Sequence, residues 1–217
     1  MNESTKNQTT IEHQQNVARE ILHKLECADP HAILAGGAPR NWYFGKPAND
    51  LDFYVYLPET TCSFEELRWK RLGLNVTHVE YEHKRHNKYK NMPDLFRMYE
   101  GVLQGVPFQV MVMNKSTFDS VLPYFGTSIC KVWWKGDDIR TTVEFLMSVY
   151  QCKIYMQEGY LVTDYHIEKM SKYFPEYDLT CYSKFFPDKI KLAEKIECNP
   201  SVYAFETKLK KLLNQGE

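Results

Sequence analysis

The sequence has no closely paired cysteines, no long apolar run and no dominating block of charge of one sign. Its six cysteines are scattered without a Cys-x-x-Cys pair, which argues against a zinc site and fits reduced thiols. No segment resembles a secretory signal or is apolar enough to span a membrane, so we expect a cytoplasmic chain with no membrane partner. The net charge of −1 provides no overall field for nucleic acid, so RNA contact would need a local basic patch.

Internal repeats and a linker rich in proline or serine are also missing. The 217 residues are 43% hydrophobic, which is enough to bury a core. We expect a flexible N-terminus at residues 1–10, a core at 11–138, and a mainly helical C-terminal extension at 139–217 that packs on the core. The predicted fold class is α/β (α+β), with a mixed central β-sheet flanked by helices.

The most informative stretch runs from residue 32 to residue 57. An apolar segment at 32–35 leads to the pair Gly36-Gly37, and a short amphipathic segment and a second turn at 45–49 follow. Residues 50–57 then alternate between polar and apolar, which predicts a strand. This order of elements is strand, glycine turn, short helix, turn and strand.

The alternation places Asp50 and Asp52 on the same face of the predicted strand. Two neighbouring carboxylates repel each other, so they need a cation between them or solvent around them. Gly36 and Gly37 allow a backbone to approach a ligand closely, and the helix that follows offers N–H groups to an anion. An anion site beside a cation site suits a nucleoside triphosphate with Mg²⁺.

The pattern Gly-Gly-x-x-Arg-Asn followed by Asp-x-Asp-Phe resembles the signature of the DNA-polymerase-β-type nucleotidyltransferase superfamily. It is similar above all to the head domains of CCA-adding enzymes and to small stand-alone nucleotidyltransferases of phages and other viruses. The resemblance covers residues 32–57 of the chain. A viral origin would place the protein in the host cytoplasm.

The resemblance implies transfer of a nucleoside monophosphate from an NTP such as ATP to a hydroxyl group. Asp50 and Asp52 would hold Mg²⁺ or Mn²⁺, and Gly36, Gly37 and Arg40 would hold the triphosphate. An RNA 3′ end, as in tRNA, is the first acceptor to consider. A protein side-chain hydroxyl is the second.

A third carboxylate, which the superfamily usually supplies from a later strand, is replaced in this sequence. The matching strand is 106–113, and its inward polar residue is Gln109, whose amide oxygen can ligate a metal but carries no charge. Glu100 on the neighbouring strand is a substitute, and Asp94 is a weaker choice. The alternative function is therefore a catalytically weakened nucleotide- or RNA-binding protein that retains the fold.

The rest of the chain gives weaker candidates. Lys46 and Asn49 could contact phosphate or base, and the basic loop at 83–90 could grip a polynucleotide. The segment 124–134 resembles a second signature of the viral group, with Gly126 where that group has Asp. Trp133 and Trp134 could floor a base pocket, whereas Cys130 reads as a buried small residue.

Periodicity and capping signals predict the remaining elements. Helices are expected at 11–28, 40–44, 63–72, 116–122, 163–175, 189–196 and 201–213; strands at 75–81 and 127–134; a hairpin at 95–103 and 106–113; and either a helix or a strand pair at 139–156.

Overall fold

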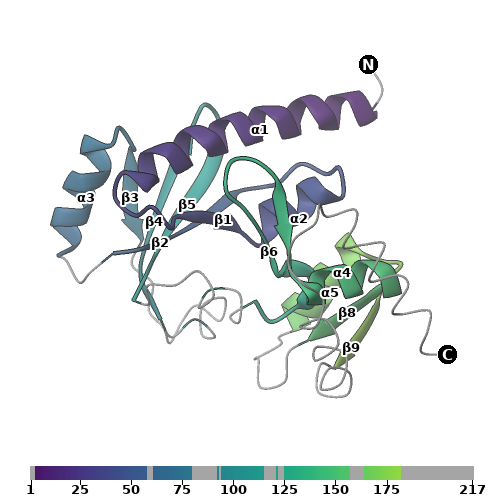
Figure 1. Cartoon of the computed structure of the whole chain (residues 1–217). Coiled ribbons are helices and arrows are strands. Elements are labelled where there is room, and N and C mark those ends of the chain that lie inside the picture. The colour runs from purple at the N-terminus through teal and green to yellow at the C-terminus, as the bar shows by residue number, and fades with distance from the viewer. Residues whose placement is uncertain are drawn as a thin grey trace, which may run out of the picture.

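A seven-stranded mixed β-sheet organises the computed structural model of the chain (Figure 1). The structure describes residues 3–57, 61–79, 92, 94–114, 121, 125–156 and 164–181. The strands lie in the order β3-β4-β5-β2-β1-β6-β7. Their bounds are β1 Ile33–Ala35, β2 Leu51–Tyr56, β3 Val76–Val79, β4 Leu95–Leu103, β5 Val106–Met113, β6 Val132–Trp134 and β7 Ile139–Thr141. The predicted mixed α/β fold class is confirmed.

One parallel pair lies at the centre of this sheet. Strands β2 and β5 run parallel, with Asp52 opposite Gln109, and the other neighbours in the sheet are antiparallel. The hairpin of β4 and β5 is confirmed at its predicted bounds. Gln104 and Gly105 have φ of 51° and 81°, as a two-residue turn between right-twisted strands requires.

Helices cover one face of the sheet. The long helix α1 (Glu3–Glu26) lies across it, and α3 (Cys62–Arg71) lies toward the β3 edge (Figure 1). The apolar stripe of α1, which includes Val17, Ile21 and Leu25, is fully buried against the sheet. None of the helices in the described part of the chain combines the length and apolar character that a membrane crossing requires.

The opposite face is polar at one end and rich in methionine at the other. The strand register places Asp52, Gln109, Glu100 and Thr77 side by side in one row. Two residues further along the strands, Met98 and Met111 belong to a separate apolar cluster on this face. This polar row therefore lies toward the ends of the strands where β2 and β5 begin.

A second, smaller unit consists of the 3₁₀ turn η4, which precedes β6, and of the elements that follow β7. These are η4 (Ser128–Cys130), α4 (Val143–Gln151), β8 (Lys153–Met156), α5 (Asp164–Tyr173) and β9 (Asp178–Cys181). Strands β8 and β9 form a parallel two-stranded sheet. A core of its own, including Phe145, Tyr155 and Phe174, holds this unit together, and Figure 1 shows it beyond the β6 side of the main sheet.

Several boundaries differ from the sequence-based expectations. Helix α1 begins at Glu3, so residues 3–10, expected to be flexible, are helical. Strand β7 pairs with β6, so the main sheet extends past the expected boundary at residue 138. Helix α3 begins at Cys62, one residue before the expected start at 63, and Thr61 is its N-cap because the Thr61 hydroxyl accepts the Phe64 N–H.

The described C-terminal part is also less helical than expected. The ambiguous segment 139–156 contains a strand, a helix and another strand, and 127–134 divides into η4 and β6. The basic loop at 83–90, most of the helix expected at 116–122, and the helices expected at 189–196 and 201–213 lie outside the described residues.

Candidate active site

In the glycine turn after β1, only the first position has a backbone conformation that requires glycine. Gly36 has φ 81° and ψ −115° and precedes the short helix α2 (Gly37–Tyr43). A Cβ on Gly36 would lie 3.1 Å from the ring of Phe125. At Gly37 the nearest atom to such a Cβ would be Arg40 Nη2 at 4.0 Å. Gly36 is therefore needed for the fold, whereas Gly37 leaves open space toward the cavity.

This difference gives a paired test of the glycine turn. We expect Gly37→Ala to fold as the wild type does and to bind NTP about tenfold less tightly, because its methyl group would occupy the space left for a phosphate. Gly36→Ala should instead lower the free energy of unfolding by roughly 1–3 kcal/mol, since it combines positive φ with a close contact. Thermal unfolding and calorimetric NTP titration of both variants measure the two effects. Equal NTP affinity of Gly37→Ala and the wild type would contradict a phosphate at this turn.

A glutamine on α1 fixes the turn that leads to the aspartates. Gln14 Oε1 accepts hydrogen bonds from Trp42 Nε1 at 3.0 Å and from the Ala48 N–H at 2.9 Å, and Gln14 Nε2 donates to the Ala48 carbonyl at 2.7 Å. Asn41 Nδ2 donates to the Pro47 carbonyl at 3.2 Å. The start of β2 is thereby tied to both α1 and α2. Gln14 could not be predicted from the sequence, because a glutamine on an amphipathic helix carries no signal of its partner.

Removing the hydrogen bonds of the Gln14 side chain should destabilise the turn at 45–49. We expect Gln14→Leu to lower the free energy of unfolding by about 3 kcal/mol, because it leaves the indole N–H and the Ala48 backbone groups without their partner. Gln15→Leu, at the neighbouring and half-buried position, is the matched control. Chemical denaturation of the two variants measures the difference, and similar stabilities would show that these hydrogen bonds contribute little.

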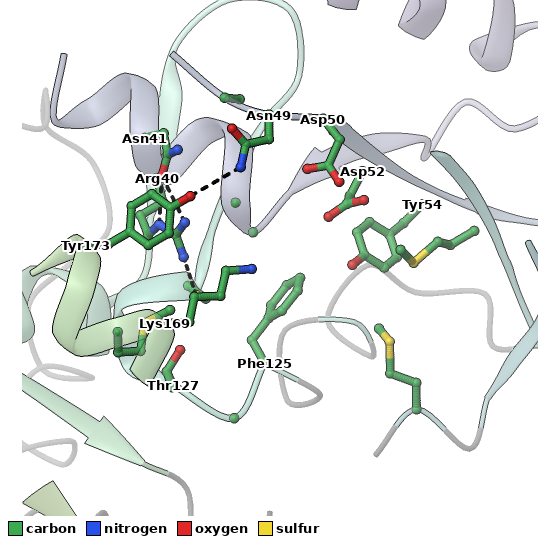
Figure 2. A pocket seen from close by; sticks show the side chains of 18 residues that line it. Arg40, Asn41, Asn49, Asp50, Asp52, Tyr54, Phe125, Thr127, Lys169 and Tyr173 are labelled. Carbon is green, nitrogen blue, oxygen red and sulfur yellow. Dashed lines mark hydrogen bonds between the residues drawn. The ribbon is translucent and has the colours of Figure 1, made fainter. Parts of the chain in front are cut away.

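Asp50 and Asp52 lie together on the polar face, as the alternation predicts. Both side chains are half-buried and line the same cavity, and Figure 2 shows their carboxylates next to each other. Their proximity creates local negative charge that a divalent cation would neutralise.

Gln109 occupies the position predicted for the third ligand. It lies opposite Asp52 on the parallel strand β5, and its Nε2 donates to Glu100 Oε1 at 2.8 Å. Its amide nitrogen therefore faces β4. Asp94 precedes Leu95, which pairs with Met113 at the far end of β4 and β5, so Asp94 lies away from the aspartates and cannot replace Gln109.

The donor set is suited to Mg²⁺. Among the described residues, no three His, Cys, Asp or Glu side chains group closely enough to hold a metal ion. Mg²⁺ does not need such a cage, because it commonly binds through one or two carboxylates and takes its remaining ligands from water and substrate phosphates. Asp50 and Asp52 would provide the carboxylates for such a site, and the Gln109 amide oxygen would be a compatible neutral ligand.

Arg40 lines the same cavity but is held from several sides. Its side chain is 4% exposed. Its Nε and Nη2 donate to Asn41 Oδ1 at 3.0 and 2.9 Å, and its Nη1 donates to Cys130 Sγ at 3.0 Å. The guanidinium also lies over the rings of Tyr173 and Phe174. Arg40 therefore places a fixed positive charge beside the glycine turn, and its role toward phosphate stays a prediction.

Helix α5, which was expected as a helix at 163–175, completes the cavity from the smaller unit. Its contribution to the cavity was not predicted. Lys169 and Tyr173 line the cavity with the aspartates, and Figure 2 shows the Lys169 side chain directed into it. Tyr173 Oη accepts from Asn49 Nδ2 at 3.2 Å, and the Tyr173 carbonyl accepts from Lys46 Nζ at 3.3 Å. Lys46 and Asn49, expected to contact phosphate or base, thus connect the turn to α5.

The cavity, of ≈ 170 Å³, has a polar end and an apolar end. The polar end contains the glycine turn, Arg40 and Lys169. At the apolar end, Tyr54 and Phe125 pack edge to face with ring centroids 5.9 Å apart, beside Met92 and Met111. Figure 2 shows the aspartates next to Tyr54, and Phe125 lies against Gly36 of the glycine turn.

Two tryptophans expected near the site belong elsewhere. Trp134 is fully buried in the core beneath α1, with its ring 5.5 Å from that of Trp42, and Trp133 packs against the methionine-rich cluster. Neither lines the cavity, so the expectation that they floor a base pocket is wrong. Cys130, expected to be buried, is half-buried and borders the cavity, as Gly126 also does.

Comparison with known proteins gives matches only among solved structures. No protein-family model matches the chain, and no curated protein matches it. An apo tRNA-processing enzyme is 14% identical, with a TM-score of 0.42 over 69% of this chain and 41% of that chain. A tRNA nucleotidyltransferase complexed with a primer tRNA and an incoming ATP analogue is also 14% identical, with a TM-score of 0.42 over 69% of this chain and 43% of that chain.

A CCA-adding enzyme in complex with CTP is 13% identical, with a TM-score of 0.42 over 76% of this chain and 38% of that chain. The chain thus spans about two fifths of the length of these solved structures. One of these proteins is described as a tRNA nucleotidyltransferase and another as a CCA-adding enzyme. At such low similarity the functional argument rests on the site itself, and the likeness to phage and viral proteins stays a prediction.

Proposed function

We propose that this protein is a nucleotidyltransferase that moves a nucleoside monophosphate from an NTP to a hydroxyl acceptor and releases pyrophosphate. One observation carries the proposal: Asp50 and Asp52 face the same cavity as the glycine turn, Arg40 and Lys169. Paired carboxylates next to a cationic, glycine-lined end are what a metal-bound triphosphate requires.

Each part of the site has a distinct task in this proposal. Gly36 and Gly37 let the backbone approach the triphosphate, while Arg40 and Lys169 balance its charge. Asp50 and Asp52, with Gln109 beside them, would hold Mg²⁺ or Mn²⁺, which would stabilise the charge that develops on the phosphate oxygens. The rigid turn held by Gln14 keeps the carboxylates oriented.

The acceptor is an RNA 3′ end or a protein side-chain hydroxyl. RNA is the first candidate from the resemblance to CCA-adding enzymes, and the basic loop at 83–90 would be its contact. A second function, a nucleotide- or RNA-binding protein with weakened catalysis, is favoured by one feature, which is the neutral Gln109 at the position of the third carboxylate.

A transfer assay tests the proposal. The protein is incubated with each α-labelled NTP, Mg²⁺ or Mn²⁺, total RNA and total protein, and both label transfer and pyrophosphate are measured. We expect transferred label and an equal amount of pyrophosphate, both dependent on the metal. NTP binding without pyrophosphate release from any mixture would favour the binding protein instead.

A further inference from the structure

We propose that the acceptor of the transferred nucleotide enters over the polar row of the sheet, and that this acceptor is a basic protein segment presenting a side-chain hydroxyl. This inference rests on the proposed function. It assigns a role to a hollow of ≈ 560 Å³ over β3, β4 and β5, which adjoins the candidate active site.

Asp50 borders both spaces. It lines the cavity that contains the glycine turn, Arg40 and Lys169, and it also lines the hollow, together with Gln109 and Glu100. With the triphosphate at the cationic end, the leaving pyrophosphate departs on that side of Asp50. The attacking hydroxyl must approach roughly opposite the leaving group, and the hollow is on that opposite side.

The register explains why the hollow is polar and continuous. The row Asp52, Gln109, Glu100 and Thr77 crosses the sheet from the aspartates to the edge strand β3. Glu100 is an exposed residue within β4, and its carboxylate accepts a hydrogen bond from Gln109. An extended chain lying along this row would bring one side chain to Asp50.

The chemistry of the lining selects the class of acceptor. Its charged members are Asp50 and Glu100, and none of the described residues that line it is Lys, Arg or His. A phosphate backbone would be repelled there, whereas Lys or Arg near the accepting hydroxyl would be attracted. At the rim, Val102 is 63% exposed and lies opposite Pro107, which offers apolar contact to a polypeptide.

The transfer step balances as follows. The acceptor hydroxyl oxygen forms a bond to the α-phosphorus, the bond between that phosphorus and the bridging oxygen breaks, and pyrophosphate leaves with the electron pair. The hydroxyl proton passes to solvent water. The product is a phosphodiester on Ser, Thr or Tyr.

The test compares acceptors and a charge reversal. The full chain is assayed with labelled NTP and four acceptors: a peptide with one Ser flanked by Lys and Arg, the same peptide flanked by Glu, an RNA oligonucleotide with a free 3′ hydroxyl, and an amine-bearing sugar. We expect the basic peptide to be labelled about tenfold or more above the others. Glu100→Lys should raise the KM for this peptide about tenfold, and Thr77→Lys, one strand further from the aspartates, should do the same with the KM for NTP unchanged. Glu12→Lys, an exposed glutamate on α1, is the matched control and should change neither value.

The outcomes separate this inference from the proposed function. Label in RNA or in the sugar in preference to the basic peptide, or an unchanged KM in Glu100→Lys, would overturn the acceptor assignment while transfer itself stands. Absence of pyrophosphate with every acceptor and with total protein would overturn the proposed function, and the acceptor assignment with it.

Discussion

Replacement of Asp52 by Asn is expected to lower nucleotidyl transfer by about a thousandfold while the protein stays folded. The variant keeps the size and most of the hydrogen bonding of the side chain but loses one of two carboxylates that face the cavity. Metal-assisted charge stabilisation is worth several kcal/mol, and the loss of ~4 kcal/mol corresponds to roughly a thousandfold in rate. Asp50→Asn should have an effect of similar size.

A binding measurement distinguishes this loss of chemistry from unfolding. Without metal, Asp52→Asn should be at least as stable as the wild type, because it removes repulsion between two neighbouring carboxylates. With Mg²⁺ and a non-hydrolysable NTP at about 100 times its Kd, the wild type should gain ~2.7 kcal/mol of stability, and the variant should gain much less. Asp138→Asn, an exposed aspartate after β6, is the matched control. Equal stabilisation of the wild type and Asp52→Asn would argue against a metal held at Asp52.

Replacement of Glu65 by Ala is expected to cost about 3–5 kcal/mol of unfolding free energy. Glu65 on α3 is fully buried; Oε1 accepts from Arg97 Nη1 at 2.8 Å, and Oε2 accepts from Tyr99 Oη at 2.7 Å. The variant would leave a largely buried guanidinium without its carboxylate. Burial and the bond to Glu65 raise the pKa of Tyr99 well above its usual range, so its hydroxyl remains a donor throughout the neutral range.

Denaturant unfolding of two further variants shows where this effect arises. Glu65→Gln retains an acceptor for Tyr99 and should cost less than Glu65→Ala. Glu66→Ala, at the next and partly exposed position of α3, should change the unfolding free energy by ~0.5 kcal/mol or less. If all three variants have similar stabilities, the buried ion pair does not anchor α3 to β4.

The strength of the local patterns decided which elements were predictable. Strands β4 and β5 were predicted at their bounds because two alternating runs flank a Gln-Gly turn, and all of that information lies within twenty residues. Helix α1 was started too late because residues 3–10 are polar; they extend the helix beyond its buried stripe. Strand β6 was predicted too long, since an apolar run does not reveal that its first residues form the turn η4.

In the candidate site, too, residues within one local pattern were predictable and residues with distant partners were not. Asp50, Asp52, Gly36 and Gly37 could be found because they lie within seventeen residues in a single pattern. Gln14 and Tyr173 could not be found, because their partners are 28 to 127 residues away in the chain. Lys169 could not be found either, because only the packing of α5 brings it to the cavity. The position of Gln109 was inferred from the resemblance, and the parallel register of β2 and β5 confirms that it lies beside Asp52.

The sequence by itself determined the polar face of β2 and the glycine turn, because side-chain alternation and backbone freedom are local properties. Only the tertiary structure decided which groups face the aspartates: Arg40 turns toward Asn41 and Cys130, and α5 closes the cavity. Packing across the sheet and between the two cores sets those contacts, and their partners are spread over more than a hundred residues. The physical reason is that burial and pairing energies depend on which surfaces meet in the fold, which no single stretch of the chain specifies.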